Sequence, residues 1–171
     1  MGRCLSRRLT LFVLSVVASL VFAVSTQSTQ ISGTIDSTLT IVEDSELVGD
    51  VSCGVVGGAC IMIAAPHVSL RLNGHTLAGT IAGCTLGTAS DDGVDVIAEQ
   101  DVAIVGPGLI EGFGGFGIFL KGDTKARVKR VTISDNCFSG IILVGTTDSD
   151  IERNVSVRNS KGSENGPCGG T

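Results

Sequence analysis

The sequence predicts an all-β fold, a right-handed parallel β-helix (a solenoid) of about five coils of roughly 24 residues, with three short strands in each coil. Short segments in which every second residue is apolar recur along the chain, and no stretch after residue 25 keeps a helical spacing of apolar residues. Gly, Asp, Asn and Ser separate the segments, and Gly is expected where a corner needs positive φ. A strand whose equivalent follows one coil later can stack on it only in parallel, which yields a solenoid.

Residues 1–25 are predicted to be a signal peptide. Three arginines precede an uncharged run from Leu9 to Val24, and the small residues Ala23–Ser25 suit cleavage. The run is shorter than the roughly 20 apolar residues of a spanning helix, so cleavage is favoured over anchorage and no stable membrane span is expected afterwards. The mature chain is therefore expected to be secreted or periplasmic.

The composition of the mature chain narrows the class of partner. Without the three arginines of the signal peptide, nine Lys and Arg face seventeen Asp and Glu. Such an acidic chain is poorly suited to neutralise phosphates, so no nucleic acid partner is expected. Trp and Tyr are absent from the sequence, which weakens the case for tight glycan binding through aromatic platforms.

Residues 26–37 are assigned to a linker or an N-terminal cap, and the β-helix is predicted over residues 38–161. Three columns of equivalent segments define its coils. The first column is Val51–Cys53, His75–Leu77, Pro107–Leu109, Val131–Ile133 and Val155–Val157. The second is Val48, Leu72, Ile104, Val128 and, one residue out of step, Ile151. The third is Cys60–Ile63, Gly93–Val96, Gly117–Leu120 and Gly140–Leu143. The hydroxyl residues in the middle of the first column are expected to face outward: Ser52, Thr76, Thr132 and Ser156.

Two segments depart from the repeat. Thr80–Ser90 contains an insertion of about eight residues, and insertions in solenoids become loops on one face, often the binding face. Residues 162–171 are assigned to a Gly-rich C-terminal tail or a truncated next coil. Because uncapped end coils leave unpaired strand edges, end-to-end association of chains is also predicted.

The five cysteines of the mature chain are an odd number for an exported protein: Cys53, Cys60, Cys84, Cys137 and Cys168. At least one of them is expected to be free, buried or paired between chains. Cys53 aligns with Leu77 and is expected to point inward as a small apolar residue, which argues against a Cys53–Cys60 disulfide. The pairing among the five stays open, and their spacing does not suit zinc.

Three motifs resemble the opening coils of exported right-handed parallel β-helix repeat proteins of the pectin-lyase-like superfamily: Asn73–Leu77, Gly112–Phe113 and Gly117–Leu120. The similar proteins are of the carbohydrate-binding/sugar-hydrolase type and the periplasmic copper-binding repeat type. The resemblance runs from Thr38 to Asn159 and suggests a short or truncated member. It implies that a ligand would lie along the outward face of the third column.

The outward face of the third column offers few catalytic groups, because it reads Met62, Asp95, Phe119 and Ile142. The resemblance implies that a lyase or epimerase would carry several carboxylates there together with Arg, Lys or His. One aspartate among apolar residues argues against catalysis. The apolar stripe is either an interaction surface or a surface covered by the inserted loop. His75 is expected to be a core or corner residue, with a base or a copper ligand as the alternative.

Asp91, Asp92 and Asp95 are the nearest approach to a carboxylate cluster. They are a candidate calcium site, since calcium takes about six to eight oxygen ligands in flexible geometry. Paired carboxylates can also serve acid–base hydrolysis, and a solvated acidic turn is the third interpretation. No other cofactor is predicted.

The basic run from Lys121 to Arg130 is a candidate for attracting an anionic glycan. The predicted ligand-binding set, with polysaccharide as the partner, is Lys121, Lys125, Arg127, Asp95 and Phe119. The alternative for the basic run is a solvated turn that balances the acidic surface.

The function predicted from the sequence is that of a secreted β-helix scaffold or binding protein, associated with carbohydrate and without an identifiable catalytic site. One alternative is a fragment of a polysaccharide lyase, glycoside hydrolase or uronan epimerase whose catalytic coils are missing. The other alternative is a structural adhesin or stalk segment.

Overall fold

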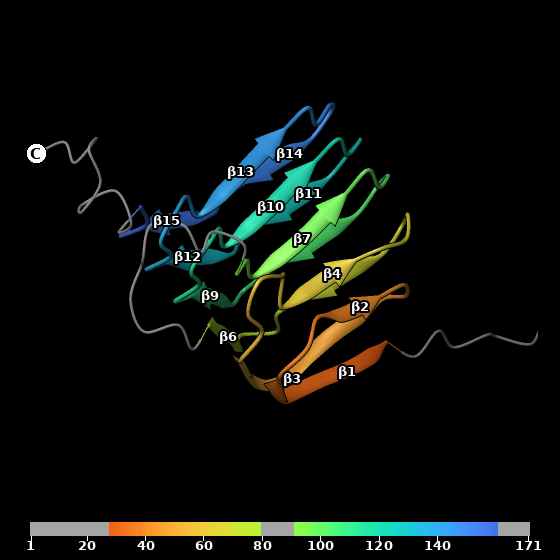
Figure 1. Cartoon of the computed structure of the whole chain (residues 1–171). Helices are drawn as coiled ribbons and strands as arrows, with labels where there is room; N and C mark the ends of the chain where they lie inside the picture. Colours follow the sequence, from red (N-terminus) through yellow and green to blue (C-terminus); the bar gives the residue numbers. More distant parts are fainter. Residues whose placement is uncertain (1–27, 80–90, 161–171) are drawn as a thin grey trace, which may run out of the picture.

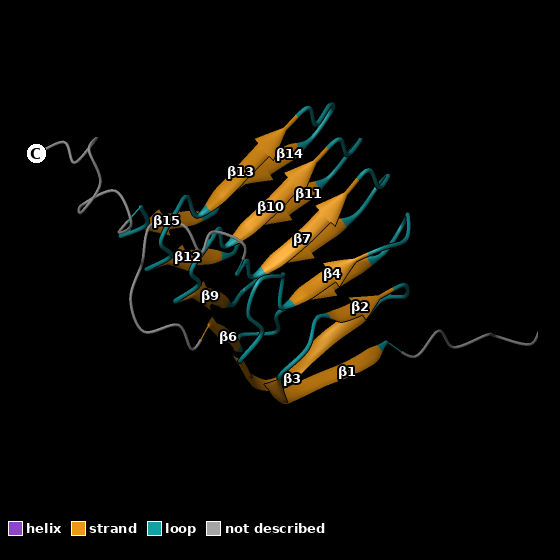
Figure 2. Cartoon of the chain, viewed as in Figure 1, coloured by secondary structure: helices purple, strands orange, loops and turns teal. Residues whose placement is uncertain are grey.

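The computed structural model describes residues 28–79 and 91–160, which form a right-handed parallel β-helix (Figure 1). These residues form strands, turns and loops, with no helix among them (Figure 2). The part of the chain that the structure describes therefore contains no helix that could cross a membrane. The predicted signal peptide, the insertion Thr80–Ser90 and the tail 162–171 lie outside the described residues.

One sheet takes a single strand from each coil, and we call it the five-stranded sheet. Figure 1 shows its strands stacked as successive rungs. Its order is β2 (Leu39–Ile41), β4 (Ile61–Ile63), β7 (Val94–Ile97), β10 (Ile118–Lys121) and β13 (Ile141–Val144). All its pairs are parallel, as a solenoid requires.

The second sheet has two arms that meet in β3 (Ser45–Cys53), a strand long enough to belong to both. The first arm continues through β5 (Ser69–Arg71), β8 (Ala103–Val105), β11 (Arg127–Lys129) and β14 (Asp150–Glu152). The second arm continues through β6 (Thr76–Gly79), β9 (Leu109–Glu111), β12 (Thr132–Ser134) and β15 (Val155–Val157). β1 (Thr29–Ile35) pairs with β3, so the segment assigned to a linker or cap contains a strand of the sheet. The two arms and the five-stranded sheet give three strands per coil, as predicted.

The corners between the five-stranded sheet and the first arm stack in a column with a left-handed backbone. His67, Asp101, Lys125 and Asp148 have φ values of 62°, 55°, 59° and 53°. The amides of the first three donate to carbonyls of the next coil. The expectation that Gly supplies positive φ at the corners is therefore only partly right. Eleven non-Gly residues of the described chain adopt it, because stacked hydrogen bonds hold the corner in place.

Aliphatic side chains fill the interior in files that run along the solenoid axis. The central members of three files are Ile61, Val94 and Ile118; Leu70, Ile104 and Val128; and Leu77, Ile110 and Ile133. None of the nine is more than 1% exposed. Full burial of such a side chain contributes about 1.5–3 kcal/mol. Because one coil alone buries only a few of them, stability comes from stacking.

The strand register confirms one predicted column and corrects another. In the five-stranded sheet Ile118 is aligned with Val94 and Ile141, as predicted. In the second arm Ile133 is aligned with Ile110 and Ser156, whereas the prediction aligned it with Leu109 and Val157. In these later coils the column is wrong by one residue, because they repeat after 23 residues. Between β3 and β6 it is wrong by two residues, because Leu77 is aligned with Val51 and Cys53 with Gly79. The one-residue step places Leu109 and Val157 on the outward face. It places Ser156 in the inward file, so the prediction that Ser156 faces outward is wrong.

The second predicted column is confirmed in the later coils and wrong in the earlier ones. Ile104, Val128 and Ile151 are aligned, and Ile151 is in step because its coil is one residue shorter than the preceding one. In the earlier coils Leu70, and not the predicted Leu72, is aligned with Ile104. Ser45, and not the predicted Val48, is aligned with Leu70.

A disulfide joins Cys53, at the end of β3, to Cys60, just before β4, with the two Cα atoms 6.0 Å apart. The prediction against this bond is wrong. Cys53 points inward as expected, but Cys60 is buried at the same corner, so two inward side chains of one coil meet. Cys137 is also disulfide-bonded, while Cys84 and Cys168 lie outside the described residues.

Candidate functional site

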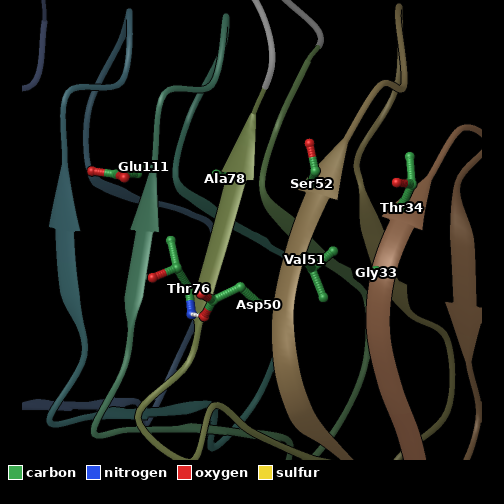
Figure 3. Close-up of a pocket in the computed structure, with 8 residues that line it drawn as sticks. All are labelled: Gly33, Thr34, Asp50, Val51, Ser52, Thr76, Ala78 and Glu111. Atoms are coloured by element: carbon green, nitrogen blue, oxygen red, sulfur yellow. Dashed lines mark hydrogen bonds between the residues drawn. The ribbon is translucent and has the colours of Figure 1, made fainter.

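An open groove of about 490 Å³ lies on the outward face of β1, β3, β6 and β9 (Figure 3). Its lining residues are Gly33, Thr34, Asp50, Val51, Ser52, Thr76, Ala78 and Glu111. We call it the polar groove. Its volume falls in the range of sites that hold small ligands.

Strand pairing brings the polar groups of the groove together from four strands. Thr34, Ser52, Ala78 and Glu111 are aligned along one row. The hydroxyls can donate and accept hydrogen bonds, and the carboxylate only accepts. The short side chain of Ala78 leaves space between the polar residues on either side. The row can therefore receive a ligand rich in hydroxyl groups.

Asp50 is held in place beside this row by the strand that follows. Its Oδ1 accepts a hydrogen bond from the Thr76 amide (2.8 Å), as Figure 3 shows. The Nδ1 atom of His75 lies 3.7 Å from the same oxygen. The Asp50 side chain is otherwise exposed, so it remains able to accept hydrogen bonds from a ligand. His75 lies at the corner before β6, in agreement with a corner role.

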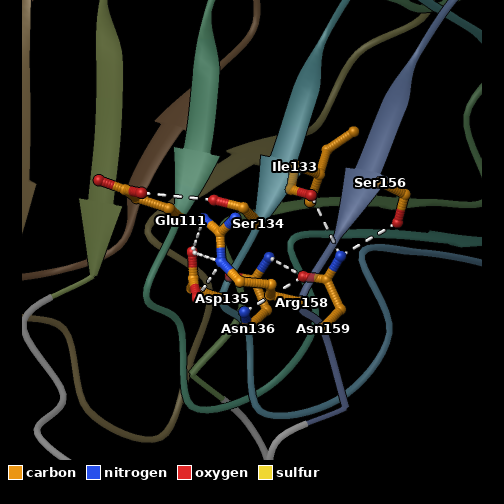
Figure 4. Close-up of polar contacts among 8 residues, drawn as sticks. All are labelled: Glu111, Ile133, Ser134, Asp135, Asn136, Ser156, Arg158 and Asn159. Carbon is orange, nitrogen blue, oxygen red and sulfur yellow. Dashed lines mark hydrogen bonds and ion pairs between the residues drawn. The ribbon is translucent and has the colours of Figure 1, made fainter.

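Beyond Glu111, towards β15, the polar groups of the same arm pair with one another (Figure 4). Glu111 Oε2 accepts a hydrogen bond from Ser134 Oγ (3.4 Å). Arg158 Nη2 donates to Asp135 Oδ2 (2.7 Å), and this hydrogen bond raises the pKa of Arg158. Arg158 is thus engaged with a carboxylate next to the groove.

Two asparagines hold the corners of the last coils in register, as Figure 4 shows in part. Asn136 Oδ1 accepts from the Phe113 amide (3.0 Å), and Asn136 Nδ2 donates to Asn159 Oδ1 (2.9 Å). Asn159 Nδ2 donates to the Ile133 carbonyl (3.1 Å). Buried amide groups are thereby satisfied from coil to coil, which fixes the arm that carries the groove.

The predicted carboxylate cluster is buried, so its interpretation as a solvated acidic turn is wrong. Asp91 Oδ1 accepts a short hydrogen bond from the Gly57 amide, and Asp92 Oδ1 accepts one from the Phe116 amide (2.6 Å). Asp95 is only 8% exposed. Its Oδ1 has no hydrogen-bond partner within residues 28–79 and 91–160.

Burial sets the protonation of this cluster. It raises the pKa of Asp92, and together with the negative charge of Asp92 it raises the pKa of Asp95 to about 7. The protonated Asp95 donates a hydrogen bond to Asp92, which also raises the Asp95 pKa. Two adjoining carboxyls that share a proton are a known consequence of burying like charges together.

Calcium at Asp91, Asp92 and Asp95 stays a prediction. Calcium needs several ionised or carbonyl oxygens open to the ion, whereas Asp91 and Asp92 each accept from a backbone amide. Among the described residues, no three His, Cys, Asp or Glu side chains are arranged to hold a metal ion.

The outward face of the five-stranded sheet carries a cluster of phenylalanines that the sequence analysis does not predict. Asp95 and Phe119 are aligned neighbours on β7 and β10. The ring of Phe116 stacks on Phe119 with centroids 5.6 Å apart, and Phe138 tilts against Phe116 at the same distance. The sequence contains one signal for this cluster, because Phe138 follows Phe116 by about one coil. We call these three residues the aromatic cluster.

The structure divides the predicted basic members of the ligand-binding set between two sheets. Lys121 ends β10, two residues beyond Phe119, whereas Lys125 lies in the corner and Arg127 on β11. Arg127 forms an ion pair with Asp101. The structure therefore brings Asp95, Phe119 and Lys121 to one face and separates Lys125 and Arg127 from them.

Other charges of this corner and of the adjoining first arm are also paired. Lys129 Nζ lies 2.6 Å from Asp150 Oδ2, and this contact raises the Lys129 pKa. His67 Nδ1 lies 3.2 Å from Asp101 Oδ2, and this hydrogen bond, with the nearby Arg127, lowers the Asp101 pKa. Cations with carboxylate partners attract an anionic ligand less strongly.

Residues 50–167 match the family described as the right-handed beta helix region. The chain belongs to the right-handed β-helix family. The comparisons with curated proteins and with solved structures found no match. Because this family hosts its activities on one shared scaffold, membership establishes the fold and not the ligand.

The polar groove of this β-helix protein lies on the second arm, where the sequence analysis predicts no site. One signal was present, because Ser52 and Thr76 are expected to face outward and do so. Glu111 could not be placed beside them, since the predicted first column ends at Leu109 and the alignment is one residue out of register.

Proposed function

We propose that this protein is an exported β-helix scaffold that binds a neutral carbohydrate in the polar groove. The observation that carries the proposal is the convergence of hydroxyl and carboxylate side chains on an open groove. Sugar hydroxyls donate to carboxylates and exchange hydrogen bonds with Ser and Thr hydroxyls. The groove therefore presents the hydrogen-bond donors and acceptors that bind a polyhydroxylated ligand.

The charge of the groove favours a neutral ligand over an acidic one. Its two ionisable lining residues are Asp50 and Glu111, both acids. The carboxylate of a uronate would meet like charge there. The nearby Arg158 is engaged with Asp135 and offers little compensation. A neutral glycan avoids this repulsion.

Export of the protein is part of the proposal and has two supports. The first 25 residues have the pattern of a signal peptide. The Cys53–Cys60 disulfide suits an oxidising compartment outside the cytosol. Secretion and carbohydrate binding are consistent with each other, because polysaccharides are encountered outside the cell.

Calorimetric titration with cellohexaose, mannohexaose and hexagalacturonate tests the proposal. Ala78→Leu fills the space between Ser52 and Glu111, so we expect binding of the neutral oligosaccharide to weaken at least about tenfold, equivalent to 1.4 kcal/mol. Ala103→Leu is the matched control. It makes the same change at a half-buried, outward alanine of the first arm, and binding should be unchanged.

Two further variants separate the groove from the aromatic cluster. Glu111→Gln keeps the shape of the groove and removes a charge-assisted acceptor, so affinity should fall about two- to tenfold. Phe119→Ala should leave affinity unchanged. Three results would overturn the proposal. They are equal losses of sugar affinity in Ala78→Leu and Ala103→Leu, tighter binding of hexagalacturonate than of the neutral sugars, and a loss of affinity only in Phe119→Ala. Binding to none of the three sugars would favour a stalk segment, and release of shorter sugars a polysaccharide-processing enzyme.

A further inference from the structure

One of the two histidines of the chain lies beside the polar groove. His75 immediately precedes β6, and its Nδ1 atom lies 3.7 Å from Asp50 Oδ1. Asp50 lines the groove and its side chain is 76% exposed, whereas the His75 side chain is 34% exposed and does not line the groove. An effect of this histidine on a ligand in the groove therefore passes through Asp50.

Hydrogen bonds of the backbone hold the imidazole next to the carboxylate. The His75 amide donates to the Leu72 carbonyl (2.8 Å), and the His75 carbonyl accepts from the Leu109 amide (3.1 Å). Asp50 Oδ1 in turn accepts from the Thr76 amide (2.8 Å), as Figure 3 shows. Both side chains thus start from anchored positions, so the corner keeps them together whatever the charge of the ring.

The strands on either side of β6 carry acids. β3 carries Asp50 and also Glu46, whose Oε2 accepts a hydrogen bond from Asn73 Nδ2 (3.1 Å) at the same corner. β9 carries Glu111 as its single charged residue. Arg71, at the end of β5, is aligned with Glu46 and not with Asp50. A positive charge on the histidine would therefore face Asp50 with no cation of β3, β6 or β9 beside it.

We infer that His75 sets the charge selectivity of the polar groove through Asp50. Histidine gains its charge as the pH falls from about 8 to 5. An imidazolium beside Asp50 offsets the charge of the carboxylate and competes with sugar hydroxyls for its oxygen atoms. An acidic sugar then meets less repulsion, and a neutral sugar loses part of an acceptor. The inference rests on the proposed function, because it requires that sugars bind in this groove.

The second acid of the groove limits the size of the change. Glu111 lies two residues farther along β9 than Leu109, whose amide contacts the histidine, and its Oε2 accepts from Ser134 Oγ. The groove therefore keeps one carboxylate that His75 does not neutralise, and neutral sugars should stay the tighter ligands at every pH. An ion pair between exposed side chains is also weak, so changes of a few fold are expected.

Calorimetric titrations with cellohexaose, mannohexaose and hexagalacturonate at several pH values between about 5 and 8 test the inference. The readout is the affinity for hexagalacturonate divided by that for the neutral sugar, because a change in the folded fraction cancels from this ratio. The carboxylates of hexagalacturonate stay ionised throughout the range. We expect the ratio to rise about two- to fivefold as the pH falls from 8 to 5.

Three histidine variants assign the effect. His75→Gln keeps a polar side chain that cannot become charged, so the ratio should stay constant across the range. His75→Lys carries a positive charge throughout, so the ratio should stay near the value that the unmodified chain reaches at pH 5. His67→Gln is the matched control. It changes the other histidine, which pairs with Asp101 at the corner between the five-stranded sheet and the first arm, and it should keep the full pH dependence.

The outcomes separate this inference from the proposed function. Binding of neutral sugar with a ratio that does not change with pH would overturn the inference alone. The same pH dependence in His75→Gln as in the unmodified chain, or its loss in His67→Gln, would also overturn the inference alone. Binding of none of the three sugars at any pH would overturn both.

Discussion

At the scale of single residues, Asp95 shows how the fold changes the chemistry of a side chain. From the sequence it is one outward aspartate in an apolar column. In the structure it is buried beside Asp92, and its pKa rises from 3.8 to about 7. The free energy of unfolding should depend on pH as a result. Between these two values the folded chain retains a proton that the unfolded chain has lost, so stability falls as pH rises from about 4 to 7.

Asp95→Asn should remove most of this dependence. The amide does not ionise, and its Nδ2 can donate to Asp92 at any pH. We expect the variant to be more stable than the unmodified chain at pH 8, by about 1–3 kcal/mol, and to gain little at pH 4. Urea unfolding at several pH values measures the difference. Asp148→Asn, an exposed acid, is the control. Parallel stability curves for Asp95→Asn and the unmodified chain would show that the buried pair does not titrate in this range.

At the scale of strands, the register decides which side chains enter the core. Ile110 lies in the core file and is fully buried, while its neighbour Leu109 points outward and is half-buried. Ile110→Ala should lower the free energy of unfolding by about 2–5 kcal/mol, because it leaves a cavity in the stack. Leu109→Ala should cost about 1 kcal/mol or less. Urea unfolding compares the two. A larger loss in Leu109→Ala would place the strand one residue out of register.

The same strands show how far the sequence could predict the fold. The class, the coil number and the five-stranded sheet follow from the repeat, because Ile118, Leu120 and their equivalents place apolar side chains on the inward face in each coil. In β15 the pattern is inverted, with Ser156 inward and Val155 and Val157 outward. Alternation then points to the wrong face, and a fixed period of 24 hides a 23-residue coil. Only the hydrogen-bonded strand pairing shows which side chains of such a strand face inward.

At the scale of the whole molecule, the candidate site was harder to predict than the fold. The polar groove takes residues from β1, β3, β6 and β9, which lie in successive coils. Its alignment depends on an insertion between β6 and β9 and on the one-residue shift of the second arm. The ligand-binding set predicted from the sequence instead combines Asp95 and Phe119 with Lys121, Lys125 and Arg127 of the basic run. The structure places Asp95, Phe119 and Lys121 on one face. It places Lys125 and Arg127 beyond a corner and pairs Arg127 with Asp101.

The central claim is that the second arm of the β-helix presents a binding surface for neutral sugar. Amide chemical shifts recorded by nuclear magnetic resonance during titration with mannohexaose or cellohexaose test it most directly. We expect the largest shift changes at Thr34, Ser52, Ala78 and Glu111, with little change around Phe119. Changes centred on the five-stranded sheet, or none at saturating sugar, would contradict it.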